Sequence, residues 1–471
     1  MLDNFFITTA LISGFVYFYG LISLLMKENL GLSEPLIGTI YGIAIAIFNR
    51  YETFSFFKNV ERNKNSMVEA DSIMKELSRI VVSLQVVAVG LVLPKSYITK
   101  EWKSLFVILV PLMLATYFIS SIFALYIFKF DIKLALLIGA CVTPTDPVLA
   151  ATIMKGKFAA RYIPKHLRNL LTAESGANDG LGSLLLAFSI FIGEKDWKKM
   201  AIKTILIDVI LSITIGATVG YICRKMQLFC KQKNWIDKES FLVSMISLGI
   251  FVTAITTLCH SADILASFVC GIAFSWDHRF LKDIKKSHLL EVIDMLINHV
   301  FFILFGFFVS FSSFKVSYIW YILVVIFIRR LPLFLGCYKV VPQLRNLREA
   351  LFAGYFGPVG VGAILFAYHG YDQIKDKNLR GIDEFLPIVQ FVVLGSIILH
   401  GATSLIITKL MSIKKEKNQD AKKFAISSDF HTSDSKNENL NDNIENATIL
   451  DIRKKYLAKK ILQSNKNNDT F

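Results

Sequence analysis

Long apolar runs separated by short polar loops repeat along the chain from the N-terminus to about residue 409. Each run approaches the roughly 20 residues that a helix needs to cross the hydrocarbon core of a bilayer. The pattern therefore predicts an all-α polytopic membrane protein with about thirteen transmembrane helices. The expected spans are residues 5–27, 35–50, 79–93, 103–128, 133–154, 168–192, 201–222, 239–258, 262–276, 289–311, 315–336, 349–368 and 384–409.

The composition of the chain agrees with this pattern. Of 471 residues, 54% are hydrophobic and 19% are charged, which is too apolar for an ordinary soluble domain. The first run lacks a basic n-region and a cleavage site, so we expect a retained helix and no signal peptide. The six cysteines stand singly in or beside apolar runs, so the sequence predicts no disulfide framework, no resident metal and no cofactor.

The net charge of +15 reflects Lys and Arg in loops next to the predicted spans. Loops on the C-terminal side carry more of these residues, including residues 155–168 and 277–288. Because cytoplasmic loops are enriched in Lys and Arg, the C-terminus is expected in the cytoplasm. The charge is spread out and has no aromatic stacking motif beside it, so nucleic acid is not an expected partner.

The chain changes in character after the last apolar run. Residues 1–410 form the predicted membrane domain, whereas residues 411–471 are polar and too poor in apolar residues to fold alone. We expect a disordered cytoplasmic tail. Its segment ATILDIRKKYLAKKILQ has helical apolar spacing with basic residues between, which is typical of a helix on anionic lipid or a partner. A transient helix without a role is the alternative.

The run at residues 133–154 is interrupted by the motif TPTDPVLA. Pro144 and Pro147 each remove a backbone donor and clash with the preceding turn, so the helix is expected to unwind at mid-membrane. Unwound backbone at that depth is tolerated only where it is buried in protein or lines a wet cavity. An intramembrane carboxylate is costly, so Asp146, with Thr145 beside it, is a candidate functional residue, with a purely architectural kink as the alternative.

The next run, LLTAESGANDGLGSLLLAF, contains Glu174, Asn178 and Asp179. Glu174 and Asn178 are four residues apart and share a helix face, and Asp179 lies about 100° further round. All three side chains can therefore border one polar cavity. Two acids in one apolar span are difficult to explain by packing, which favours a functional role.

Further charged and polar residues interrupt later runs. Arg329 and Arg330 lie within a run of Ile, Val and Leu, and a buried guanidinium needs a carboxylate, for which Glu174 and Asp179 are the candidates. Asp263 is either the N-cap of the following helix or a functional acid. Two more polar residues in an apolar run have no assigned role: Asp294 and Asn298.

A second interrupted run occurs at residues 349–368, where Gly354, Gly357, Pro358 and Gly360 weaken the middle of the predicted helix. The two interrupted helices are the fifth and the twelfth in our count, which are corresponding positions in two inverted repeats. This match predicts a transporter site at the repeat interface. Close helix packing is the alternative explanation of the glycines.

Eight motifs in order carry a resemblance to a known family. The sequence resembles the fungal plasma-membrane alkali-metal cation/proton antiporters of the monovalent cation:proton antiporter superfamily over most of residues 5–410. The motifs are ELSRIVVSLQVVAVGLVLPKSYI, TPTDPVLA, GKFAARYIPKHLRNLLTAESGANDG, ESFLV, VIDMLIN, FIRRLP, LREALFAGYFGPVGVGAI and IILHGATSL.

The resemblance implies a 13-helix sodium/proton antiporter-like fold with a mobile core, inverted repeats, two crossed discontinuous helices, a homodimer and a plasma-membrane location. It also implies exchange of Na+, Li+ or K+ for H+ and no enzymatic activity. The matching positions are Thr145 and Asp146 at the crossing, Asn178 and Asp179 as the ion-binding pair, Glu174 with Arg329 or Arg330 as a buried acid and its partner, Asp263 as a functional acid, and His400 in the late HG motif.

Three positions depart from the family pattern. Pro144 stands where relatives often have a small residue, so the unwinding is expected to differ in detail. Ala262 stands where fungal relatives often have a second acid, which removes an acidic pair with Asp263. Tyr355 replaces a frequent His before FGP, so no pH-sensing role is expected there.

The expected mechanism is competition between a proton and a dehydrated cation for Asp179, with Asp146 as a second transient cation ligand. A Na+-coupled symporter of organic anions on a related fold is the alternative. A channel and an intramembrane aspartyl protease are weaker rivals, because neither a filter loop nor a complete protease signature is present.

Overall fold

The computed structural model describes residues 2–26, 32–50, 64–94, 96–154, 163–192, 196–276, 289–377 and 379–402. These residues form helices and connecting turns and contain no β-strand. The chain divides into two compact units, residues 1–408 and 409–471. The predicted tail and its basic segment lie outside the described residues.

The helices of the first unit follow the predicted apolar runs. In chain order they are α1 (Leu2–Leu24), α2 (Glu34–Arg50), α4 (Lys64–Val92), α5 (Tyr97–Lys100), α6 (Trp102–Val107), η3 (Ile108–Leu112), α7 (Met113–Phe128), α8 (Ile132–Val142), α9 (Pro147–Met154), α11 (Lys165–Phe191), α12 (Trp197–Lys203), η4 (Thr204–Leu211), α13 (Ser212–Gln232), α14 (Lys238–Leu258), α15 (Asp263–Ser275), α17 (Leu289–Phe308), η5 (Phe311–Ser313), α18 (Val316–Leu323), η6 (Val324–Ile328), α19 (Leu331–Cys337), η7 (Tyr338–Val340), α20 (Leu347–Tyr355), α21 (Val361–Ile374) and a final helix over Ile382–Ala402.

Each of the predicted spans coincides with helical residues in the described part of the chain. The differences are at several ends and at residues 329–330, where the span predicted at 315–336 is broken. The helix predicted at 79–93 begins at Lys64, and the helix predicted at 201–222 continues to Gln232. Hydropathy does not detect these extensions because their surfaces are polar. Seven described helices are long and apolar enough to cross a membrane by length and composition alone, since the other spans are shorter, interrupted or charged.

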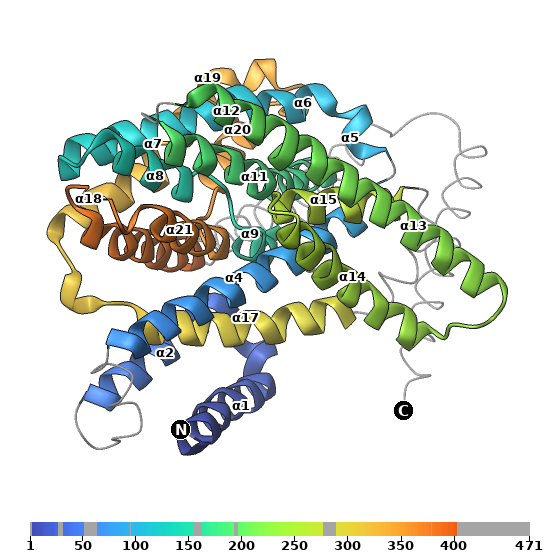
Figure 1. Ribbon diagram of the computed structural model, residues 1–471, viewed down its shortest axis with the longest axis horizontal. Coiled ribbons are helices and arrows are strands. Elements are labelled where there is room, and N and C mark those ends of the chain that lie inside the picture. Colours follow the sequence, from blue (N-terminus) through green and yellow to red (C-terminus); the bar gives the residue numbers. More distant parts are fainter. Residues whose placement is uncertain are drawn as a thin grey trace, which may run out of the picture. The chain divides into compact units, whose positions relative to one another are not determined.

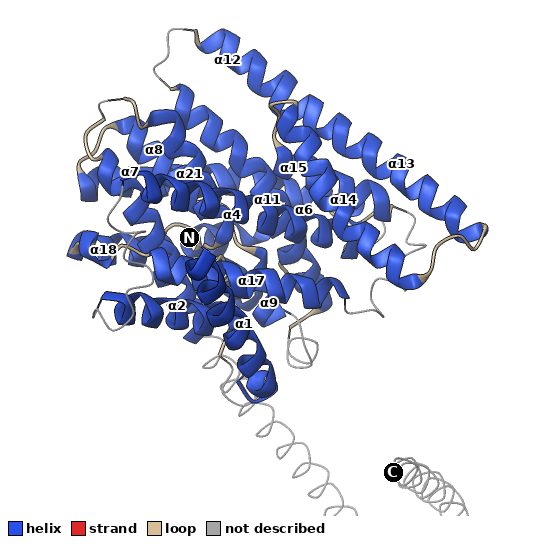
Figure 2. Ribbon diagram, turned by 60° about the horizontal axis from the view of Figure 1, so that its bottom comes forward, coloured by secondary structure: helices blue, strands red, loops and turns tan. Residues whose placement is uncertain are grey.

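The helices form two groups according to their contacts. We call α2, α4, α13, α14, α15 and α17 the scaffold helices, and α7, α8, α9, α11, α18 to α21 and the final helix the core helices. Figure 1 shows α2, α4 and α17 together, with α7, α8 and α21 on the other side of α4. Figure 2 shows α13 running alongside α14 and α15. The two groups meet where α4 and α15 pack against α11 and α21.

Small residues allow the closest contacts in the scaffold. A Cβ on Gly42 of α2 would lie 2.0 Å from the carbonyl oxygen of Ile303, and a Cβ on Gly306 of α17 would lie 2.2 Å from that of Thr39. The two backbones therefore touch directly, which is the usual way in which helices associate in lipid.

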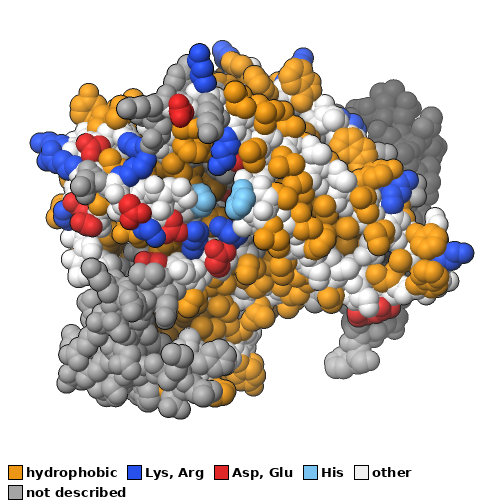
Figure 3. All heavy atoms as spheres, in the orientation of Figure 1, with side chains coloured by type: hydrophobic (Ala, Val, Ile, Leu, Met, Phe, Trp, Pro, Cys, Tyr) orange, Lys and Arg blue, Asp and Glu red, His pale blue; other side chains and the backbone are white. Residues whose placement is uncertain are grey.

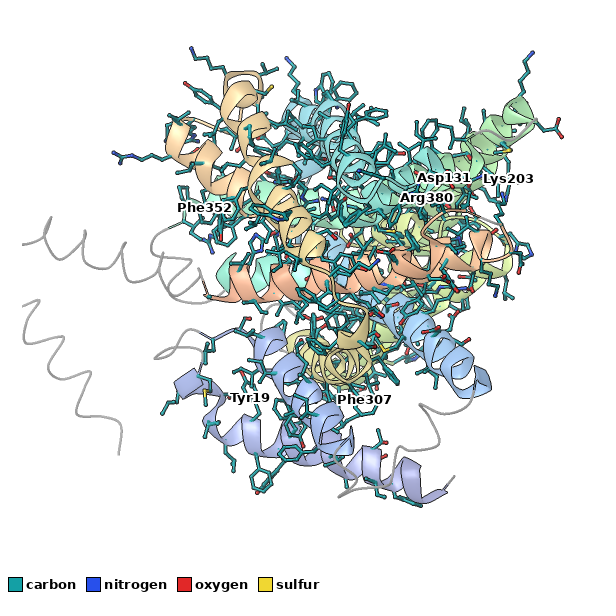
Figure 4. The ribbon with its side chains drawn as sticks, turned by 90° about the vertical axis from the view of Figure 1, so that its left-hand side faces the viewer. Tyr19, Asp131, Lys203, Phe307, Phe352 and Arg380 are labelled. Atoms are coloured by element: carbon teal, nitrogen blue, oxygen red, sulfur yellow. The ribbon has the colours of Figure 1, made fainter. Side chains whose placement is uncertain are left out.

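One end of the core is held by a hydrogen bond between segments that are far apart in the sequence. Arg380 N, just before the final helix, donates to Asp131 Oδ2, just before α8, at 2.8 Å. Figure 4 shows these two residues together at one end of the core, with Phe352 of α20 at the opposite end. The starts of α8 and of the final helix are thus held at the same level.

Candidate cation site

Two interrupted helices cross within the core. Helical structure stops between α8 and α9 at residues 143–146 and between α20 and α21 at residues 356–360. The two breaks are joined directly, because Asp146 N donates to Pro358 O at 2.7 Å. The predicted pair of crossed discontinuous helices is therefore confirmed. Prolines and glycines at both breaks prevent continuous helical hydrogen bonding.

Asp146 caps two half-helices at once. Its Oδ2 accepts from Leu149 N in α9 at 2.7 Å, and its Oδ1 accepts from Val361 N in α21 at 3.1 Å. Both helix N-termini carry a partial positive charge that the carboxylate offsets. Gly360 makes this possible, since a Cβ there would lie 2.4 Å from the Asp146 carboxyl carbon.

Arg329 satisfies the opposite helix ends. Its guanidinium donates to the carbonyl oxygens of Val142 and Thr143 at the end of α8 and, at 2.6 Å, to that of Gly357 just beyond α20. The expectation that Arg329 needs a carboxylate is wrong, because these C-terminal carbonyls carry the partial negative charge that it requires. Asp146 and Arg329 together thus offset the partial charges of the four half-helix ends at the crossing.

Arg330 is paired with Glu174, as predicted for one of the two arginines. The contact is bidentate, with Nη1 to Oε1 at 2.5 Å and Nη2 to Oε2 at 2.8 Å, and both side chains are buried. The expectation that the two arginines lie inside a helix is wrong, because the helix is broken between η6 and α19. Pro332 in the first turn of α19 explains the break, since it cannot donate a helical hydrogen bond.

Asn178 and Asp179 of α11 lie beside the crossing and are 3% and 1% exposed. Asn178 Nδ2 donates to Thr145 Oγ1 at 2.8 Å, which directs its Oδ1 away from Thr145. Asn178 Oδ1 and Asp179 Oδ2 are buried without a hydrogen-bond partner among the described residues. A buried oxygen without a hydrogen-bond partner costs free energy unless a proton, a water molecule or a cation binds to it. Asp179 also lies against α21, since a Cβ on Gly362 would be 3.0 Å from its Oδ1.

The final helix supports the second break. Ser396 Oγ accepts from Val359 N at 2.8 Å, and His400 Nε2 contacts Tyr355 O at 3.2 Å while Nδ1 lies 3.2 Å from Ser396 Oγ. Nδ1 also lies 3.0 Å from the carbonyl oxygen of Ser396. The structure therefore places His400 next to the second break, against Tyr355 of α20.

Asp263 lies at the scaffold side of the site and belongs to α15 itself. The N-cap position is occupied by Ala262, so the N-cap interpretation is wrong. Asp263 Oδ1 accepts from Ile264 N at 2.8 Å, and Oδ2 forms an ion pair with Arg79 Nε of α4 at 3.3 Å. This acid therefore joins two scaffold helices.

A cavity of about 310 Å³ lies between core and scaffold helices. Ser183 and Phe366 in its lining are one turn beyond Asp179 and Gly362, and Asp263 and His369 also face it. Figure 3 shows a hollow with histidine, basic and acidic side chains around its mouth.

Several residues in this region were not assigned from the sequence. Arg79, Ser396 and the Lys75–Asp372 ion pair between α4 and α21, 2.6 Å long, link segments far apart in the chain. The available signal was a polar residue in an apolar run, which does not identify its partner. No cluster of three His, Cys, Asp or Glu suited to a resident metal is found in the described part of the chain.

Comparisons with known proteins agree with this architecture. The family model described as "Sodium/hydrogen exchanger, transmembrane" matches residues 14–409. A probable Na+/H+ antiporter of Schizosaccharomyces pombe is 36% identical over 84% of this chain and 55% of that protein. The Na+/H+ antiporter of Saccharomyces cerevisiae is 34% identical over 85% of this chain and 43% of that protein. Na+/H+ antiporter 2 of Zygosaccharomyces rouxii is 34% identical over 83% and 51%.

The chain spans about half the length of these three curated relatives. A solved structure shares the fold: the sodium proton antiporter MjNhaP1 from Methanocaldococcus jannaschii aligns with a TM-score of 0.62 and 18% identity, covering 86% of this chain and 96% of that one. The fold prediction is confirmed by this alignment.

Proposed function

Because the chain belongs to the sodium/hydrogen exchanger family, we propose that it is a secondary active antiporter that exchanges Na+, and also Li+ and K+, for H+. The observation that carries the proposal is the pair of buried oxygens without partners, Asn178 Oδ1 and Asp179 Oδ2, beside two unwound helices. Hard cations take oxygen ligands, and broken helices at mid-membrane are the usual place for them in transporters. Nothing in the site favours an organic-anion symporter.

Each residue of the site has a distinct role in this proposal. Asp179 carries either the proton or the cation, and Asn178 Oδ1 is a second ligand that Thr145 orients. Asp146 contributes negative charge and keeps both half-helix N-termini in place, although each of its oxygens retains lone pairs for a cation. Glu174, Arg329, Arg330, Asp263 and His400 hold the surrounding helices in position.

Exchange follows from charge balance at Asp179. A buried carboxylate carries one negative charge, which either a proton or a cation neutralises. Binding of the cation therefore releases the proton, and binding of the proton releases the cation. If only the two neutralised forms cross between the two sides, the two flows are coupled without a further device. Tests use purified protein in liposomes with an imposed pH gradient and Na+, Li+, K+ or choline outside.

Competition at one carboxylate predicts a specific pH dependence. Lowering the pH on the cation side should raise the apparent KM for Na+ while the maximal rate stays constant. Where the carboxyl is mostly protonated, the rise should approach about tenfold for each pH unit. Initial rates over a matrix of Na+ concentration and pH check this. An apparent KM independent of pH, with only the maximal rate changing, would exclude a shared site.

Alternating access requires the core to move against the scaffold, and the Lys75–Asp372 ion pair crosses that boundary. Replacing both residues by Cys and joining them with a short reducible thiol cross-linker should stop exchange, and reduction should restore it. Each single-Cys variant treated with the same reagent is the control. Cross-linked protein that exchanges at the untreated rate would show that α4 and α21 stay together throughout the cycle.

The proposal also covers the membrane location, the orientation and the oligomeric state of the protein. We infer a plasma-membrane location with a cytoplasmic C-terminus, supported by the excess of Lys and Arg in loops on that side. We further infer a homodimer, in line with the expectation from the family resemblance. Cation extrusion and maintenance of pH and salt balance would then be its cellular role.

A further inference from the structure

A hydrogen-bonded line of three polar side chains joins α17 to α4 inside the scaffold. Asn298 Nδ2 donates to Asp294 Oδ1 at 3.0 Å, and Gln85 Nε2 donates to Asn298 Oδ1 at 2.8 Å. Gln85 and Asn298 are 4% and 2% exposed. Polar residues this deep among apolar helices need an explanation.

The carboxylate at the start of the line sets the direction of both amides. An ionised carboxylate only accepts hydrogen bonds, so Asn298 must turn its NH2 group toward Asp294 and its oxygen toward Gln85. Gln85 must then donate to Asn298, which directs Gln85 Oε1 away from the line. This oxygen is buried and has no hydrogen-bond partner among the described residues.

The helix contacts give the direction of α4 relative to its neighbours. α4 runs parallel to α15, since Arg79 pairs with Asp263 near the start of α15 and Gly90 O accepts from Ser275 Oγ at its end. In contrast, α11 runs antiparallel to α15. A Cβ on Gly176 would meet Phe268, and one on Gly180 would meet Leu265, so the positions advance in opposite directions. α4 and α11 are therefore antiparallel.

This direction fixes the depth of Gln85. Val89 of α4 faces α11 at Gly176, where an added Cβ would lie 2.7 Å from Val89 Cγ1. Gln85 is one turn earlier on the same face of α4. Because the helices are antiparallel, Gln85 is level with the turn of α11 that follows Gly176, which contains Asn178 and Asp179. Unpartnered oxygens thus occur at one depth on both the scaffold and the core.

We propose that Gln85 Oε1 is a scaffold ligand for the transported cation, bound when the core brings Asn178 and Asp179 alongside α4. Asp294 orients Gln85 through Asn298. The ligand class is a partly dehydrated alkali-metal cation, which takes carbonyl and carboxylate oxygens. Asp294 and Asn298 are positioning residues. The inference rests on the proposed exchange function.

The test replaces Gln85 by Met, which keeps the length of the side chain and removes the oxygen. Initial exchange rates in liposomes should show a KM for Na+ at least fivefold higher, a maximal rate close to wild type and an altered order of preference among Li+, Na+ and K+. A second readout is the rise in melting temperature that Na+ causes in detergent, which requires binding and no transport. The midpoint Na+ concentration should increase in parallel.

A matched control is available in Gln227 of α13, whose Nε2 donates to Ser244 and whose Oε1 is likewise buried without a partner among the described residues. Gln227→Met should leave the KM, the preference order and the Na+ midpoint unchanged. Asp294→Asn is the second variant. It should raise the KM, because an amide in place of the carboxylate can also donate, so it no longer fixes the direction of Asn298 and Gln85.

The outcomes separate this inference from the proposed function. Wild-type protein that exchanges no alkali cation would overturn the proposed function itself. Wild-type exchange with an unchanged KM, preference order and Na+ midpoint in both Gln85→Met and Asp294→Asn would overturn only the role of Gln85. The same shift in Gln227→Met would also overturn it, since the effect would then be a general one of losing a buried amide.

Discussion

Asp179→Asn is expected to reduce cation-driven dissipation of a pH gradient to the level of empty liposomes, while the protein still inserts and folds. The amide has nearly the same size and remains neutral at every pH, so it neither carries a proton nor offers the charge that holds a dehydrated cation. Because Asp179 Oδ2 has no hydrogen-bond partner in the described part of the chain, little native bonding is lost. The effect should therefore fall on transport and spare stability.

The control for this prediction is Asp376→Asn, the same change at an exposed position beyond α21. It should retain the wild-type rates and cation preference. Folding of both variants is checked by gel filtration in detergent and by thermal melting. Alkali-cation-specific exchange that persists in folded Asp179→Asn would show that another group carries the proton.

Glu174→Leu is expected to destabilise the protein by about 3–5 kcal/mol, because it leaves the Arg330 guanidinium buried without its carboxylate. The charge cannot reach water, since both side chains are almost completely buried. The double variant Glu174→Leu with Arg330→Met should recover much of this loss. The Met side chain can still pack on Phe334, on which the guanidinium now stacks 4.2 Å from the ring centre.

Thermal unfolding in detergent measures these differences. The control is the partly exposed ion pair between Lys315 and Glu384, 2.8 Å long, where Glu384→Gln should change stability by at most about 1 kcal/mol. A double variant that is less stable than Glu174→Leu would show that the arginine stabilises the break mainly through its bond to Ala353 O at 3.1 Å, and that the ion pair itself contributes little.

The sequence was sufficient to predict the helical fold, the positions of the spans and both helix breaks. The length of an apolar run and the Pro or Gly residues that interrupt it are local properties of the sequence. The sequence also indicated the Glu174–Arg330 pair, since a buried charge demands an opposite one. The prediction for Arg329 was wrong, because its acceptors are backbone carbonyl oxygens at the ends of α8 and α20, more than a hundred positions away in the case of α8. Every residue has such a carbonyl group, so the sequence does not identify which ones bind the arginine.

The dual cap made by Asp146 could not be predicted from the sequence, for a similar reason. The motif places Asp146 before Pro147, which indicates a cap for α9, but the bond to Val361 exists only once the two breaks cross. The same holds for Gln85. A single amide in an apolar run is visible in the sequence, whereas the orientation imposed by Asp294 is visible only in three dimensions.

The central claim is that a cation and a proton compete for Asp179, and proton release on cation binding tests it most directly. Calorimetric titration of Na+ into purified protein, repeated in buffers that differ in ionisation enthalpy, gives the number of protons released for each Na+ bound. The account predicts a value that rises toward about one as the pH is lowered and that vanishes, together with Na+ binding, in Asp179→Asn. Na+ binding without proton release at any pH would contradict it.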